Sequence, residues 1–431
     1  MNKSISLIVL LYLFFSLTTW VQASNATHAL NPTGNLTLDQ VKQFVMLQNF
    51  EVQAAKKQIE SKEKLIHQAG VLPNPEIELE SENIFGSGGN SGFDNAETTA
   101  KLGTFLELGG KRHHRVQAAR IEKKLAELNY FAVFSTQIKI AKQRSTEILK
   151  QQALLKLDQE RLKTNEEFLR AIRQRVVKGR LNIVEQKRAN ILVSQSKLAL
   201  TKRNQELINA KNQLSLLWGY SEAQFGSLEG NLQKTGDLPS LMDLQKKSES
   251  VISVLLKKTE IDLAKVEIGI EKSQGVQDLS ISGGLKHENS SNDKSFVLSA
   301  GIPIAIFDRN TAAIEAAELH LNQKELELNS TLQDFQNQLT TLVSQAKLLK
   351  TEIDSLDQTI IPESKDVFRH IQEGYLKGKY SYLAVLEAQN ASFEFREHYL
   401  NSLTEFHNVM AEITQLTKQI KKGDDYESNN N

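Results

Sequence analysis

Four glutamates, spaced two residues apart, form the most specific charge pattern in the chain. They are Glu76, Glu78, Glu80 and Glu82. The residues between the first three are apolar, Ile77 and Leu79. Alternation with a period of two predicts a β-strand that carries all four carboxylates on one face. Such a face cannot contact lipid, and around a pore it would favour cations. The alternative is a solvated strand face without selectivity.

Two glycine-centred stretches, 199 positions apart, carry cations beside a predicted turn. They comprise Lys178, Gly179, Arg180, Leu181 and Asn182, and Lys377, Gly378, Lys379, Tyr380 and Ser381. Helical patterns flank both stretches, so each predicts a tight turn between antiparallel helices, where glycine permits a positive φ. Cations are also favourable near the end of the incoming helix. The residues either only cap helices or form an exposed basic rim that contacts a partner.

No catalytic, cofactor or metal site is predicted. His113 and His114 are adjacent, and neighbouring side chains on a helix point about 100° apart, which does not make a chelate. Cysteine is absent, which excludes disulfides, thiolate metal sites and a cysteine nucleophile. Phosphate-loop, nucleophile-elbow and zinc-protease motifs are also missing. We therefore expect neither a cofactor nor enzymatic activity.

Long helices with an apolar residue at every seventh position must place these groups. The repeat runs through Ala141, Ile148, Leu155, Leu162, Leu169 and Val176, and through Ile314, Leu321, Leu328, Phe335, Leu342, Leu349 and Leu356. This period predicts antiparallel coiled coils, and a helix over 111–177 would be about 100 Å long. Pro362 should kink its helix. Since Lys+Arg and Asp+Glu balance at 52 each, no net charge favours nucleic acid as a partner.

Four stretches break the helical pattern and alternate like strands. They are residues 75–83, 99–108, 278–287 and 295–304. Their length of about ten residues suits the strands of a membrane barrel. Four strands cannot close a barrel, because about eight are needed, whereas three copies of the chain would supply twelve. The alternative is a pair of soluble hairpins packed on helices.

The chain divides into two copies of one plan. Residues 1–23 predict a secretory signal peptide, with an uncleaved membrane anchor as the alternative. The first repeat spans 24–218, with strands in 75–108 and a helical hairpin whose tip lies near 179. A Gly- and Pro-containing connector follows at 219–241. The second repeat spans 242–420, with strands in 277–304 and a tip near 378. Residues 421–431 form a polar tail that we expect to be disordered.

These elements together resemble the TolC-like outer-membrane efflux factor family. "LPNPEIELESEN" is similar to the family's first strand, and "LELGGKRHHRVQAA" and "GIPIAIFDRNTAAIEAAE" to its two strand-to-helix junctions. "GYLKGKYSYLAVLEAQ" is similar to its second hairpin tip. The Gly-Lys-Arg and Asp-Arg-Asn junctions indicate the branch that serves cobalt–zinc–cadmium and copper–silver efflux.

The resemblance implies a mainly α fold with a small β part. The expected architecture is a homotrimer with a 12-stranded transmembrane β-barrel in outer-membrane lipid, four strands coming from each chain. Its long helices would form a periplasmic α-barrel, and the connector an equatorial region. The expected function is the exit duct of a tripartite pump, which passively exports heavy-metal cations. Its partners would be a periplasmic adaptor and an inner-membrane pump of the resistance-nodulation-division type.

Two departures from the family pattern accompany the resemblance. Many relatives carry a lipidated N-terminal cysteine, and this sequence has none. Their second tip often has two acids three residues apart that help to gate the pore, where Ala384 and Glu387 stand here. Glu387 is thus the candidate gate residue. The alternative function is a periplasmic adaptor or a secreted coiled-coil scaffold, although an adaptor normally has one helical hairpin between compact β domains.

Overall fold

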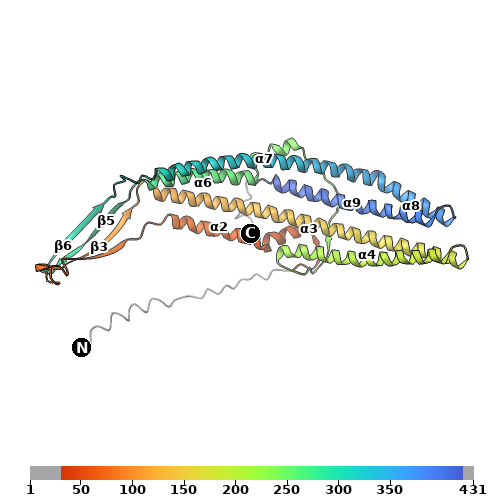
Figure 1. Cartoon of the computed structure of the whole chain (residues 1–431), viewed down its shortest axis with the longest axis horizontal. Coiled ribbons are helices and arrows are strands. Elements are labelled where there is room, and N and C mark those ends of the chain that lie inside the picture. Colours follow the sequence, from red (N-terminus) through yellow and green to blue (C-terminus); the bar gives the residue numbers. More distant parts are fainter. Residues whose placement is uncertain (1–30, 421–431) are drawn as a thin grey trace, which may run out of the picture.

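The computed structural model describes residues 31–420 as an elongated molecule with a small sheet at one end and helical hairpins at the other (Figure 1). The expected signal peptide (1–23) and polar tail (421–431) lie outside the described residues. The sheet carries the glutamate row and the hairpin ends carry the glycine turns. The two groups singled out by the sequence are therefore at opposite ends of the molecule.

Both halves of the chain follow the order of strand pair, long helix, turn and returning helix. The first half contains β1 (Gly34–Thr37), α1 (Leu38–Gln48), α2 (Phe50–Ala69), β2 (Glu76–Glu82), β3 (Glu97–Leu106), α3 (Lys111–Val177) and α4 (Ile183–Ser215). The rest contains β4 (Phe225–Glu229), α5 (Leu241–Gln245), α6 (Ile252–Gln274), β5 (Leu279–Glu288), β6 (Asp293–Gly301), α7 (Thr311–Ser355), α8 (Ile361–Leu376) and α9 (Tyr382–Leu416). The fold is mainly α with a small β part, as predicted.

Helix α3 is the central long helix and runs from the sheet to the first hairpin tip (Figure 1). It has 67 residues, which corresponds to about 100 Å at 1.5 Å per residue. α2 and α6 pack beside its sheet-proximal half, and α4 and α9 beside the remainder. Ala141, Ile148 and Leu169, three members of the seven-residue repeat, are buried. The repeat therefore marks a real packing seam.

The interruption expected at Pro362 takes the form of a π-helical turn. Residues Leu356–Ile360 form this turn, and α8 begins directly after it with Pro362 in its first turn. Proline has no N–H to donate to the preceding turn, and a wider turn accommodates that loss without ending the helix. The helix of the second repeat thus continues past the proline toward its tip.

The four predicted strands form one antiparallel sheet in the order β2-β3-β5-β6. The central pair joins the two halves of the chain, with Leu102 opposite Gly283 and Leu106 opposite Leu279. β2 and β6 are the edge strands and have no further partner within residues 31–420. The sheet therefore ends in two free edges, which are hydrogen-bonding templates for other strands.

The equator of the molecule is tied together by the connector. β4 lies within residues 219–241 and pairs in parallel with β1. Trp218, just before this segment, is fully buried against Phe44 and Phe225. Among residues 31–420 no helix is long and apolar enough to cross a membrane.

Candidate functional site

The two hairpin tips have the same backbone geometry. At the first, the Arg180 amide donates to the Arg175 carbonyl over 2.8 Å, and the Gly179 amide to the Val176 carbonyl over 2.9 Å. At the second, Lys379 donates to Gly374 and Gly378 to Tyr375, both over 2.9 Å. Both glycines have a positive φ, 69° and 76°. These bonds define the helix-ending Schellman motif, in which glycine occupies the left-handed position.

The residue that starts the returning helix also has the same role in both tips. The Asn182 side chain accepts from the Val184 amide over 3.0 Å, and the Ser381 hydroxyl accepts from the Ala384 amide over 3.1 Å. Each thereby satisfies an amide at the start of a helix that has no intrahelical partner. Asn182 and Ser381 therefore have a structural task, which leaves the exposed residues of the turns available for contacts.

An aromatic cluster holds the two tips together. The Tyr375 ring centroid lies 5.5 Å from that of Phe168 and 6.2 Å from that of Tyr382. The Tyr375 hydroxyl donates a short hydrogen bond to the Glu185 carboxylate on α4. Burial and this carboxylate raise the pKa of Tyr375 above its ordinary value. Tyr375 therefore stays a neutral donor that links the second hairpin to the first.

The rim beyond this cluster is exposed and both basic and apolar. Lys178, Arg180, Lys377 and Lys379 are exposed, as are both glycines. Next to them Val177 is 87% exposed and Leu383 is 62% exposed. Sequence reasoning found the cations but missed these two apolar residues, because Val177 lies one position before the first turn and Leu383 lies two positions after the second. The rim thus offers an apolar surface with basic groups around it.

A buried row of hydrogen-bonded polar side chains links the two hairpins, about one helical turn from the aromatic cluster on the side of the sheet. The Gln389 amide donates to the Asn165 carbonyl oxygen over 2.7 Å, and the Asn165 amide donates to the Ser196 hydroxyl over 2.7 Å. All three residues are at most 5% exposed. The row links α9, α3 and α4, and no sequence motif indicated it. A fully satisfied buried network fixes the relative position of these helices.

The candidate gate residue Glu387 lies on α9, close to the second turn. Its side chain is exposed and makes no ion pair with any residue of the described chain. Ala384, at the other matching position, carries the amide that Ser381 caps. The carboxylate of Glu387 is therefore available to a partner outside this chain.

At the other end of the molecule, the predicted glutamate face is the mainly polar side of the sheet, and it also carries Phe105 and Val297. Glu78 lies opposite Lys101 on β3, and the Lys101 ammonium contacts Glu80 over 2.6 Å and Glu78 over 4.0 Å. Sequence reasoning did not find this cross-strand lysine, because pairing depends on the strand register. Cross-strand pairs of opposite charge stabilise the sheet and neutralise part of the row.

One rung at the far end of this face is acidic on all four strands. It comprises Glu82, Glu97, Glu288 and Asp293, which are opposite one another in register. Lys286 contacts Glu82 and Glu97 beside the rung. Like charges opposite one another are destabilising, so the rung is a cost that folding alone does not explain.

The opposite face of the sheet is apolar and exposed. Ile77 and Leu79 of β2 are 78% and 75% exposed, and Phe296 and Leu298 of β6 are 77% and 83% exposed. Leu102 and Leu285 lie between them on the same face. A sheet with one acidic and one exposed apolar face matches a barrel wall between water and lipid.

The histidines show no sign of a metal site. The His114 ring packs closely on Gly269 of α6, and the His113 ring lies beside it with the centroids 5.6 Å apart. Within the described residues no group of three or more histidine or carboxylate side chains is arranged to hold a metal ion. His114 therefore serves the packing of α3 against α6.

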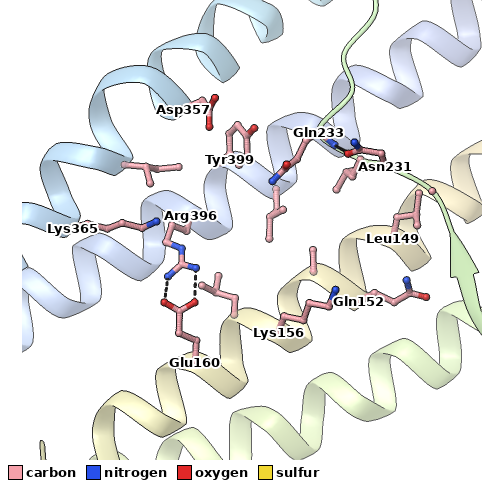
Figure 2. A pocket seen from close by; sticks show the side chains of 16 residues that line it. Leu149, Gln152, Lys156, Glu160, Asn231, Gln233, Asp357, Lys365, Arg396 and Tyr399 are labelled. Carbon is pink, nitrogen blue, oxygen red and sulfur yellow. Dashed lines mark hydrogen bonds and ion pairs between the residues drawn. The ribbon is translucent and has the colours of Figure 1, made fainter. Parts of the chain in front are cut away.

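A cavity of about 430 Å³ lies beside the π-turn, between α3, α9 and the connector (Figure 2). Arg396 of α9 binds Glu160 of α3 through two hydrogen bonds of 2.8 and 2.6 Å. The Arg396 guanidinium holds the pKa of Glu160 below its ordinary value. Asp357 of the π-turn lies near Tyr399 in the same view (Figure 2). The ion pair joins α3 of the first hairpin to α9 of the second, between the connector and the tips. The residues that line the cavity form no catalytic arrangement.

Comparison with known proteins identifies the fold and the family. The outer membrane efflux protein family matches residues 43–220 and 256–417, most of the chain. The chain belongs to the outer membrane efflux protein family. The cobalt-zinc-cadmium resistance protein CzcC of Cupriavidus metallidurans is 28% identical over 383 residues, which cover 89% of this chain and 90% of CzcC.

Solved structures share the fold of this chain. The CusC structure superimposes with a TM-score of 0.75 at 16% identity, over 89% of this chain and 92% of CusC. The open state of the Neisseria gonorrhoeae MtrE outer membrane channel gives 0.71 at 18% identity, over 89% and 90%. These comparisons confirm three predictions, namely the family, the outer-membrane location and a function that is not enzymatic.

Proposed function

We propose that this outer membrane efflux protein is the homotrimeric exit duct of a tripartite pump and passively exports heavy-metal cations. The observation that carries the proposal is the sheet, with one acidic face, one exposed apolar face and two free edges. Three such sheets joined edge to edge would give twelve strands and leave no edge exposed to lipid. The helices would continue this barrel as a periplasmic tube. The alternative of an adaptor or scaffold has no comparable use for the apolar face.

Heavy-metal cations are proposed as substrate because of the similarity to CzcC, a cobalt-zinc-cadmium resistance protein. The polar strand face supports this class, since Glu76, Glu78, Glu80 and Glu82 would face the lumen. As a duct needs no tight binding of its cargo, the arrangement favours cations without a chelating site. The partners would be an inner-membrane pump of the resistance-nodulation-division type and a periplasmic adaptor.

The exposed rim of the hairpin tips is proposed to contact the adaptor. Its cations would bind carboxylates, while Val177 and Leu383 supply apolar contact area. Glu387, exposed and unpaired in the described chain, is proposed to contribute to the gate at the same end. The linked Tyr375 and Glu185 pair supports a closed arrangement of the two hairpins.

Membrane fractionation of the expressing strain, together with a panel of metals, tests the proposal. The protein should remain in the outer-membrane fraction after carbonate washing and run as a trimer after chemical cross-linking. A deletion strain should become sensitive to cobalt, zinc or cadmium and regain resistance from the restored gene. Release by carbonate would contradict the barrel, and sensitivity to drugs alone would contradict the substrate class.

A further inference from the structure

The segment between β6 and α7 exposes four large apolar side chains within six residues. Its sequence is IPIAIF, residues 302–307, and we call it the apolar strap. Ile304 is 82% exposed and Phe307 is 99% exposed, with Ile302 and Ile306 more than half exposed as well. Contiguous exposed apolar groups mark an interaction surface. No helix or strand of the described residues covers this surface.

The corresponding junction of the first repeat is short and is held by an ion pair and a hydrogen bond. Only four residues, 107–110, separate β3 from α3, whereas nine separate β6 from α7. Glu107 is held by Arg115 in a two-point ion pair, and the Leu108 amide donates to Asp278 over 3.0 Å. The extra length of the second junction is thus occupied almost entirely by the apolar strap.

The base of the strap is fixed to the helices. The Asn310 side chain donates to the Glu271 carbonyl and to its carboxylate over 2.8 and 2.7 Å. Gly275 lies so close to the Arg309 carbonyl that a Cβ there would be 2.9 Å from its oxygen. The strap therefore projects from a rigid base.

The strap continues the apolar face of the sheet. Phe296, Leu298 and Ala300 face that side of β6, and Ile302 and Ile304 keep the same two-residue spacing. Pro303 lacks an N–H, so the strap offers one donor fewer to a hydrogen-bonded ladder with the strand of a second copy. We infer that the apolar strap is an interfacial anchor that inserts into the phospholipid leaflet on the helix side of the barrel, an inference that rests on the proposed membrane-spanning role of the sheet.

Charged residues mark the aqueous border of the strap. Asp308 and Arg309 follow Phe307 directly, and the Arg309 Nε donates to the Ala305 carbonyl over 3.3 Å. An arginine beside apolar groups keeps its head in the polar zone while its stem covers them. Figure 1 places this junction between the sheet and the long helices, the level at which the leaflet would end. An apolar face about 5–10 Å deep in the interface is typical of such anchors.

The absence of cysteine allows a direct test by single labels. The variants Ile304→Cys and Phe307→Cys, each carrying a polarity-sensitive fluorophore, are reconstituted as the full chain in phospholipid vesicles that contain lipid-borne quenchers. Leu298→Cys on the sheet is the lipid control, and Leu319→Cys, 69% exposed on α7, is the aqueous control. The strap labels should lose as much fluorescence as Leu298→Cys, most strongly with the quencher near the head group. Leu319→Cys should lose none.

Quenching at the strap equal to that at Leu319→Cys would overturn the anchor while leaving the barrel intact. Loss of quenching at Leu298→Cys as well would overturn the membrane-spanning sheet, and the anchor with it.

Discussion

Two tyrosines in the aromatic cluster of the tips have opposite roles for their hydroxyls. Tyr375 donates to Glu185, whereas the buried Tyr382 hydroxyl has no hydrogen-bond partner within residues 31–420. A buried polar group without a partner lowers the free energy of unfolding, whereas a hydrogen bond to a carboxylate offsets this loss. The same chemical change at these two positions should therefore have different effects.

Tyr375→Phe should lower the free energy of unfolding by about 1–3 kcal/mol, since it leaves the Glu185 carboxylate without its donor. The tips should also separate more easily, which would raise the conductance of the reconstituted channel. Chemical denaturation and single-channel recording measure the two effects. Tyr382→Phe is the matched control and should change stability by less than about 1 kcal/mol. Equal losses in both variants would contradict the role of the hydroxyl.

The pH dependence at Tyr382 follows from burial, which raises its pKa to about 12 from the ordinary 10.0. A raised pKa means that the folded state holds the proton more tightly, so its contribution to stability is complete below pH 10 and disappears as pH rises through about 12. The stability difference between the wild type and Tyr382→Phe should be constant up to pH 10 and then shift against the wild type. Denaturation midpoints at a series of pH values measure it, and a constant difference throughout would contradict burial of the phenol.

At the scale of elements, the hairpin turns depend on two glycines with open surroundings. A Cβ at Gly378 would meet nothing within 4 Å, so alanine there is opposed only by the positive φ. Gly378→Ala should cost about 1 kcal/mol of stability, and Gly179→Ala the same. Gly236 has equally open surroundings without a positive φ, so Gly236→Ala is the control and should be neutral or stabilising. Thermal unfolding of the three variants compares them, and a loss at Gly236 alone would contradict the assignment.

The basic rim belongs to the same elements and leads to a functional prediction. Arg180→Glu together with Lys379→Glu should abolish metal resistance while the trimer still forms, because an acidic rim would repel the carboxylates proposed to dock there. Growth on metals and cross-linking of the trimer are the measurements. Lys247→Glu reverses an exposed charge near the equator and should leave resistance intact. Full resistance in the double variant would place the adaptor contact elsewhere.

The sequence predicted elements whose signals are local. The bounds of α3 follow from the seven-residue spacing of its apolar residues. The two turns follow from the glycines, which can adopt the left-handed backbone conformation that these turns require. The partners of these elements could not be predicted, because Gln389 and Asn165 lie 224 positions apart and read as ordinary polar positions of two separate helices. The pairing of Lys101 with the glutamates required the strand register, which alternation alone does not fix. At Pro362 the sequence indicated a break but not its form as a π-turn.

At the scale of the whole molecule, the acidic strand face should set the ion preference of the duct. Exchanging Glu76, Glu78, Glu80 and Glu82 for glutamine leaves Lys101 and Lys286 with fewer acidic neighbours, so the cation-to-anion permeability ratio should fall. Reversal potentials of reconstituted channels in a salt gradient measure it. Glu222→Gln, on an exposed equatorial residue, is the control. An unchanged ratio would show that the row is only a solvated face.

The two free edges of the sheet also have a genetic consequence. β2 and β6 are different surfaces, so subunits would join head to tail and every copy would use both edges. A chain with an intact β2 and a damaged β6 could still join one neighbour and would leave its ring open. Such an allele would inactivate normal copies made in the same cell and behave as dominant. Loss of the whole chain would be recessive, because no incomplete ring would form.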